Sequence, residues 1–196
     1  MKLKFILSIL LVFTAVTSSA QVSVGLRDTR YANIGYTFLD NWNVELEHSL
    51  YSEEMKLQYV RLYASYTRSF GIVSLKAQPY IGMTYSNSYS SEGCNIEATV
   101  SPLKWLDIRG GFTPHHDSGL GYKSLYLGSL KLNINDQISI IGSYTNRPEY
   151  RMPERRIRAG LLFKVKNLSV QPELSIPAGS GEGHFIRVLA SMNYTF

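Results

Sequence analysis

The sequence contains a single cysteine, Cys94, in 196 residues. An exported domain that depended on disulfides would carry an even set of cysteines, so no disulfide framework is expected. After its first 20 residues, the chain also lacks an apolar run long enough to cross a membrane as a helix, which takes about 20 residues. Strong charge of one sign is missing too, because 20 basic and 15 acidic residues give a net charge of +5. With so mild a charge and no nucleic-acid-binding motif, nucleic acid is not an expected partner.

The start of the chain has the layout of a secretory signal peptide. Lys2 and Lys4 give it a positive charge, residues 5–16 are apolar, and the next four residues are small. The apolar stretch is short for a spanning helix, and an N-terminal anchor helix is the alternative. We expect a signal peptide at residues 1–20 and an exported domain at residues 21–196.

Apolar residues recur at every second position through most of the exported domain, which predicts β-strands. The last segment shows the pattern best, with one apolar face made of Ile186, Val188, Ala190, Met192, Tyr194 and Phe196. A membrane protein without apolar helices must be a closed barrel, because every backbone N–H and C=O in lipid needs a partner. The apolar face then meets lipid and the polar face lines the lumen. A soluble β-sandwich or lipocalin-like barrel is the alternative fold, since alternation alone does not distinguish a core from lipid.

Two kinds of turn alternate along the chain. Five are tight, at residues 40–41, 70–71, 102–104, 135–136 and 166–167. Six are mostly longer and more polar, at residues 28–30, 52–55, 86–93, 117–121, 147–154 and 178–183. Transmembrane barrels have this asymmetry, with short periplasmic turns and longer outer loops. The sequence therefore predicts an all-β, antiparallel, up-and-down transmembrane barrel with both termini in the periplasm.

Eleven turns divide the domain into about twelve strands, with ten or eight as alternatives. The predicted strands cover residues 21–28, 31–39, 42–51, 56–70, 72–86, 94–101, 105–115, 122–134, 138–147, 155–165, 168–177 and 184–196. Most reach the roughly 9–11 residues that a tilted spanning strand needs. Trp42 and Trp105 both fall beside short turns, which is typical of an aromatic girdle at a membrane interface. Ordinary strand aromatics are the other interpretation.

The chain ends in the residues Met192, Asn193, Tyr194, Thr195 and Phe196. This ending resembles the C-terminal assembly signal of Gram-negative outer-membrane barrels, a terminal aromatic residue preceded by apolar residues at alternate positions. The resemblance implies insertion into the outer membrane by the barrel-assembly machinery. The size and strand number are similar to those of narrow twelve-stranded porins for acidic oligosaccharides, although no motif identifies a subfamily or fixes that substrate.

The polar face of the expected strands carries most of the charged residues, since charge is costly on the lipid side of a barrel. The residues expected to line the lumen are Arg27, Arg61, Lys76, Arg109, Lys131, Arg158, Glu173 and Arg187. The same face also carries Glu45, Glu47, Glu97, Asp107, Arg156 and Lys164. Basic residues therefore outnumber acidic ones on the predicted lumen wall.

Two functions fit such a lumen. An excess of Arg and Lys would make a narrow, weakly anion-preferring channel for small solutes, which is the function predicted here. Alternatively, ion pairs such as Glu173 with Arg158 and Arg187 would close the lumen. The barrel would then be a non-conducting structural or accessory subunit of an envelope complex. Twelve strands lie between filled eight-stranded barrels and the wide pores of sixteen or more strands.

A second group of basic residues surrounds a predicted outer loop and consists of Arg147, Arg151, Arg155 and Arg156. We expect this group at the outer mouth. The planar guanidinium group of arginine is well suited to bind phosphate. The group would contact lipopolysaccharide, or it would draw anionic solutes toward the pore. Outer-membrane lipids and other envelope proteins are thus the further partners considered.

The segment His115, His116, Asp117 and Ser118 is the one local set with hydrolase chemistry, and it falls at a predicted outer loop. A lipid A-modifying enzyme would need the serine, a base and an orienting group within hydrogen-bond reach, which neighbouring loop residues rarely provide. A metal would need three or four converging ligands. No catalytic site, metal or cofactor is expected, and solvated loop residues are the preferred interpretation.

Overall fold

The computed structural model describes residues 20–50, 59–85, 89–119, 121–147, 155–179 and 185–196. The predicted signal peptide lies outside these residues except for its last position, so its cleavage remains a prediction. Twelve strands are present: β1 (Gln21–Arg27), β2 (Tyr31–Phe38), β3 (Trp42–Ser49), β4 (Tyr59–Phe70), β5 (Val73–Thr84), β6 (Ser90–Leu103), β7 (Leu106–Asp117), β8 (Gly121–Asn133), β9 (Ile138–Thr145), β10 (Arg156–Val165), β11 (Leu168–Pro177) and β12 (Arg187–Thr195).

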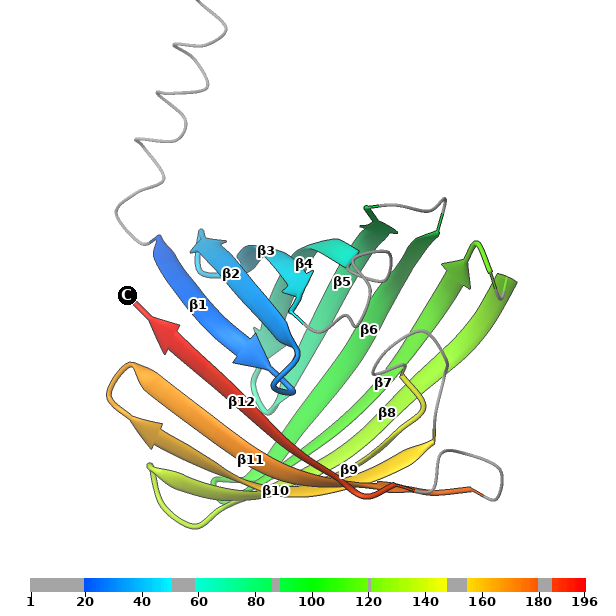
Figure 1. Cartoon of the computed structure of the whole chain (residues 1–196). Coiled ribbons are helices and arrows are strands. Elements are labelled where there is room, and N and C mark those ends of the chain that lie inside the picture. The colour runs from blue at the N-terminus through cyan, green and yellow to red at the C-terminus, as the bar shows by residue number, and fades with distance from the viewer. Residues whose placement is uncertain (1–19, 51–58, 86–88, 120, 148–154, 180–184) are drawn as a thin grey trace, which may run out of the picture.

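Each strand pairs antiparallel with the next, and β1 pairs with β12 to close the barrel. Figure 1 shows the first strand beside the last, with the hairpins following one another around the wall. Val24 is opposite Tyr194 in the closing pair, and the Phe196 amide donates to the Val22 carbonyl at 2.8 Å. The predicted all-β up-and-down barrel of twelve strands is therefore confirmed. Among the described residues, no helix is long and apolar enough to span a membrane.

The two ends of the barrel differ in their connections. Tight turns after β2, β4, β6, β8 and β10 share one end with Gln21 and Phe196, and we call it the short-turn end. The opposite end is the long-loop end. β6 begins at Ser90 rather than at the predicted position 94, because its pairing with β5 continues to Met83 opposite Ser90. The predicted loop after β5 is correspondingly shorter.

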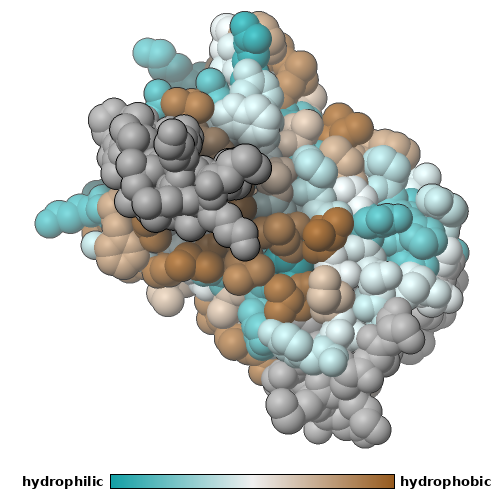
Figure 2. Space-filling model, turned by 90° about the horizontal axis from the view of Figure 1, so that it is seen from above, coloured by the Kyte–Doolittle hydropathy of each residue, from teal (hydrophilic) through white to brown (hydrophobic). Residues whose placement is uncertain are grey.

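The barrel is polar inside and apolar outside. Along β5, Gln78, Tyr80 and Thr84 are buried, whereas Ile81 and Met83 are more than half exposed. Figure 2 shows hydrophobic side chains in a broad area across the middle of one face, with hydrophilic residues toward its margins. An apolar surface of this extent is unfavourable in water and is what lipid requires of a spanning barrel. The arrangement opposes the soluble β-sandwich or lipocalin-like alternative.

Aromatic side chains gather at the short-turn end. The Trp42 ring lies 4.8 Å from that of Tyr66, and the Tyr194 and Phe196 rings meet edge to face at 4.9 Å. Trp105 is likewise half exposed beside the turn that joins β6 to β7. Aromatic rings at one level of an apolar wall fit the interface between hydrocarbon and headgroups.

The hairpin of β1 and β2 is short, which positions the functional site. β1 has seven residues, compared with 12 to 14 in β4 through β8. Asp28 and Thr29 form its turn with φ values of 55° and 58°, and the Arg30 amide donates to the Arg27 carbonyl at 3.0 Å. Two left-handed residues in succession reverse the chain within the three residues that separate Arg27 from its partner Tyr31. The Asp28 amide also bonds the Ser191 hydroxyl of β12 at 3.0 Å, which holds the turn against the wall.

Candidate functional site

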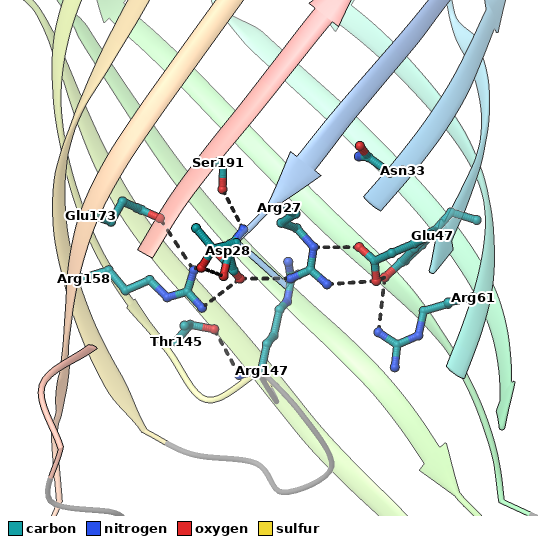
Figure 3. Close-up of polar contacts among 12 residues, drawn as sticks. Arg27, Asp28, Asn33, Glu47, Arg61, Thr145, Arg147, Arg158, Glu173 and Ser191 are labelled. Atoms are coloured by element: carbon teal, nitrogen blue, oxygen red, sulfur yellow. Dashed lines mark hydrogen bonds and ion pairs between the residues drawn. The ribbon is translucent and has the colours of Figure 1, made fainter. Parts of the chain in front are cut away.

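Arg27 and Asp28, at the end of β1, lie at the centre of a charge network inside the barrel (Figure 3). The Arg27 guanidinium donates to both carboxylate oxygens of Glu47 on β3, at 2.7 and 2.9 Å. A third nitrogen of Arg27 lies 3.1 Å from Asp28, and the guanidinium stacks 4.3 Å above the Tyr31 ring. Glu47 is 1% exposed, so this two-pronged bond satisfies a fully buried charge.

Arg158 extends the network from β10. Its two terminal nitrogens lie 3.0 and 3.4 Å from the Asp28 oxygens, and one of them lies 3.7 Å from Glu173 on β11. Asp28 thus bridges Arg27 and Arg158, which belong to strands that are not neighbours in the barrel. The ion pairs link β3, the β1–β2 turn and the β10–β11 wall.

A tyrosine-rich branch continues from Glu47 along β4 and β5. The Tyr63 hydroxyl donates to Glu47 at 3.3 Å and accepts from Arg61 at 3.2 Å. The Arg61 guanidinium lies 5.0 Å from the centre of the Tyr80 ring. Tyr63 and Tyr80 are both buried, and their rings form part of the wall of a small cavity in this part of the lumen.

Arg147, just after β9, reaches into the lumen and meets Glu97 of β6. Its Nη1 atom donates to Oε1 of Glu97 at 2.6 Å, and its amide is fixed by the Thr145 hydroxyl at 3.0 Å. Gly111 makes this possible, because a Cβ atom there would lie 3.0 Å from Arg147 Nη2 and 3.1 Å from Glu97 Cγ. We call this contact the Arg147–Glu97 strut.

The residues that the structure describes line two cavities inside the barrel, with volumes of about 480 and 260 Å³. The larger is lined mainly by β7 through β12, and the smaller by β3 through β6 with Leu125 of β8. Arg27 and Arg147 line both cavities and therefore form the boundary between them. The lumen is thus divided at mid-barrel by two guanidinium groups, each held by a carboxylate.

Burial changes along the barrel axis. Lumen-facing residues toward the long-loop end are fully buried, including Ser49, Thr113, Asp117 and Ser175, each at 1% exposure or less. Lumen-facing residues toward the short-turn end, such as Ser74, Lys131 and Ser169, are only half-buried. Side chains therefore fill the lumen more completely at the long-loop end.

Seven of the eight residues predicted to line the lumen border a cavity. The larger cavity has Arg27, Arg109, Lys131, Arg158 and Glu173, while the smaller has Arg61, Lys76 and again Arg27. Arg187, on β12, lines neither cavity. Lys131 pairs with Asp107 at 3.2 Å, so it too has a partner within the wall.

The arginines predicted at the outer mouth do not form one group. Arg147 points into the lumen rather than outward, because Glu97 and the space above Gly111 receive it. Arg156 is 1% exposed, with its guanidinium bonded to the Ser175 side chain and carbonyl and to the Phe185 carbonyl. The Arg156 guanidinium is therefore enclosed by the protein instead of being presented at the outer mouth, where we expected it. Arg155 is exposed, and Arg151 lies outside the described residues.

The His115–Ser118 segment belongs mostly to strand β7 rather than to a loop. Alternation turns His115 inward, where Nδ1 lies 2.6 Å from the Tyr80 hydroxyl, and turns His116 outward beside Glu92 at 3.4 Å. The Ser118 hydroxyl accepts the Ser90 amide. The strand geometry thus separates the two histidines instead of assembling them around a serine. No group of three or more metal-ligating side chains occurs in the part of the chain that the structure describes.

Sequence reasoning missed the central position of Asp28 and the inward course of Arg147. Asp28 reads as a polar turn residue, and only the short β1–β2 hairpin places it inside the barrel. The neighbouring Arg27 and the acidic residue in a three-residue turn were the available signals. Nothing local to Arg147 indicates its partner, because Glu97 lies 50 residues away.

At the sequence level, no protein-family model matches the chain, and no curated protein is detectably similar to it. Solved structures do match. A KdgM porin in complex with disordered oligogalacturonate has a TM-score of 0.69 at 12% identity, and a second KdgM porin structure has a TM-score of 0.60 at 12% identity. The NanC porin has a TM-score of 0.54 at 10% identity. All three alignments cover 90% of this chain and 98% of the porin. The chain therefore has the twelve-stranded fold of these small outer-membrane porins.

Proposed function

We propose that this barrel is a narrow channel of the outer membrane that passes small solutes with a weak preference for anions. The charge of the cavity walls is the observation that carries the proposal. The two cavities are lined by seven basic residues and five acidic ones, and a sixth acidic residue, Glu97, pairs with Arg147, which leaves an excess of one positive charge. A basic excess inside a low-dielectric wall favours negative solutes, and a small excess gives a small preference.

The narrowness follows from the links that cross the lumen. Asp28 and Arg158 join β1 to β10, and the Arg147–Glu97 strut joins the end of β9 to β6. Each of the two cavities beside these links holds less than 500 Å³. Small hydrated ions and small organic acids match such a space, whereas folded polymers do not.

Single-channel recording of the refolded exported domain in a planar bilayer tests the proposal. A gradient of potassium chloride should give discrete conductance steps and a reversal potential on the anion side. Conductance steps without a bias toward anions would contradict the anion preference but support the channel function.

The filled long-loop end favours a second candidate, a non-conducting accessory subunit of an envelope complex. Buried lumen residues there, such as Thr113 and Asp117, are consistent with a closed barrel. A silent bilayer, together with reproducible co-purification of another envelope protein, would support this second function. Co-purification is measured in the native outer membrane at endogenous expression.

We further propose that the short-turn end faces the periplasm and that Arg155 contacts lipopolysaccharide phosphate. Short turns at the periplasmic side are the rule for bacterial barrels. Replacing Cys94 by serine and placing a single cysteine at Asp136 or at Gly119 tests the orientation. An impermeant maleimide on whole cells should label the Gly119 position alone. Labelling at the Asp136 position alone would show that the barrel has the opposite orientation in the membrane.

A further inference from the structure

Glu97 on β6 is surrounded by three basic side chains. Arg147 donates to it at 2.6 Å, and Nη1 of Arg109 lies 3.8 Å from its Oε2 atom. Lys76 is its cross-strand partner on β5 and interacts with it electrostatically. Three positive charges therefore face one buried carboxylate, which is 8% exposed.

A second carboxylate near this cluster, Glu45, does not cancel the excess. It accepts a hydrogen bond from Asn33 at 2.7 Å and acts on Lys76 only through space. Counting both carboxylates, the cluster still has one more positive charge than negative. The rest of the cavity wall is balanced, with Arg27, Arg61 and Arg158 facing Asp28, Glu47 and Glu173, and Lys131 facing Asp107.

Two of the three basic groups have donors available to a solute. The Arg109 side chain is 45% exposed, and its 3.8 Å contact with Glu97 is too long for a hydrogen bond. Lys76 makes no direct hydrogen bond or ion pair with any residue that the structure describes. Arg147, by contrast, donates to Glu97 through Nη1, and its Nε and Nη2 atoms are buried without a hydrogen-bond partner among the described residues.

The cluster also has access to the whole lumen. Arg109 lines the larger cavity, Lys76 lines the smaller one, and Arg147 lines both. A solute that enters either cavity therefore meets one of the two available donors. An uncompensated positive charge in a low-dielectric interior attracts an anion strongly.

We propose that Arg109 binds a small monocarboxylate anion in the larger cavity, beside Glu97, whose own charge is neutralised by Arg147, and that Lys76 strengthens this binding through space. This site rests on the channel function proposed above and names the class of solute. The planar guanidinium of Arg109 presents parallel N–H donors that match the two oxygens of a carboxylate, and Lys76 adds a positive charge from the smaller cavity. Chloride has the charge but lacks the paired oxygens, so the site prefers the carboxylate.

Binding of ¹³C-labelled acetate to the refolded exported domain in detergent micelles, followed by NMR titration, tests the site. Lys76→Gln is compared with Lys164→Gln, which removes the same charge from an exposed residue that lines neither cavity. Wild type and Lys164→Gln should bind acetate saturably, and Lys76→Gln should bind about tenfold more weakly. Equal weakening in both variants, or no saturable binding by the wild type, would overturn the site.

Two additions keep the test decisive. Arg109→Gln, at a more exposed position, should show the same loss, so a misfolded Lys76→Gln barrel would not end the test. Heat-dependent mobility on a gel reports folding for each variant. Chloride that displaces acetate at equal concentration would overturn the preference for carboxylates.

Bilayer recordings on the same samples separate the site from the channel. Block of chloride current by acetate in the wild type, but not in Lys76→Gln, supports both. A bilayer without conductance, together with saturable acetate binding, would support the binding site and contradict the channel function. Conductance by the wild type without acetate binding would support the channel function and contradict the binding site.

Discussion

Arg147 and Glu97 meet across the barrel at 2.6 Å although 50 residues separate them in the chain. The contact links the end of β9 to β6, strands that are separated in the wall by β7 and β8. It is also one of the two elements that separate the cavities, the other being Arg27. The boundary between the cavities therefore depends on two charge-assisted contacts, Arg147 with Glu97 and Arg27 with Glu47.

Replacing Arg147 by alanine should join the two cavities. The single-channel conductance should rise by roughly twofold, because the boundary between the cavities loses one of its two arginine side chains. The anion preference should fall at the same time, since one positive charge is removed. Arg155→Ala, which removes an exposed arginine outside both cavities, is the control. An unchanged conductance in Arg147→Ala would show that the strut does not limit the channel.

Gly111→Ala should displace the strut without changing any charge. Its Cβ atom would lie 3.0 Å from Arg147 Nη2 and 3.1 Å from Glu97 Cγ, so one of these side chains must move. We expect a conductance change in the same direction as in Arg147→Ala but smaller. Gly110→Ala is the matched control, since a Cβ there meets nothing within 4 Å. Equal behaviour of the two variants would contradict the role of Gly111.

Glu47→Gln should destabilise the barrel strongly. The change leaves the Arg27 guanidinium without its two-pronged acceptor and weakens the Tyr63 contact. Breaking a buried ion pair by removing one partner costs about 3–5 kcal/mol. Urea unfolding in lipid vesicles, followed by tryptophan fluorescence, measures the free energy of unfolding.

The control for Glu47→Gln is Glu92→Gln. Glu92 also pairs with a basic group, His116 at 3.4 Å, but its side chain is 63% exposed. An exposed pair contributes about 0–1 kcal/mol, so this variant should unfold close to the wild type. A similar loss in both variants would mean that burial does not set the strength of the Glu47 pair.

Phe196→Ala should slow assembly more than it lowers stability. Phe196 is 69% exposed, and its ring lies on the outer wall. Its hydrogen bond to the Val22 carbonyl is donated by the backbone amide, so the substitution leaves the pairing of β1 with β12 intact. Pulse-chase measurement of the folded fraction in the outer membrane reports the rate of assembly. Phe185→Ala removes a 78% exposed aromatic residue near the start of β12 and should assemble at the wild-type rate. Normal assembly of Phe196→Ala would argue against the C-terminal signal.

Much of the barrel is readable from local pattern. β12 is an example, where Val188, Met192 and Tyr194 face outward and Leu189 faces inward as the alternation predicts. Successive side chains of a strand point to opposite faces, so the orientation of one side chain determines which face every other residue of the strand occupies. The expectation that His115–Asp117 lie in a loop was wrong. Three polar residues in succession are typical of a loop, but here pairing with β6 and β8 extends the strand through them.

The sequence by itself determined the number of strands, their antiparallel order and the polar inner face, because these follow from a period of two and from the rule that lipid leaves no backbone group unpaired. Only the tertiary structure decided which charges meet. Closure of β1 on β12 and the short β1–β2 hairpin bring Asp28 to Arg158, and the space above Gly111 admits Arg147 to Glu97. Long side chains from strands far apart in sequence reach one another only after the barrel has closed, and no local pattern encodes that distance.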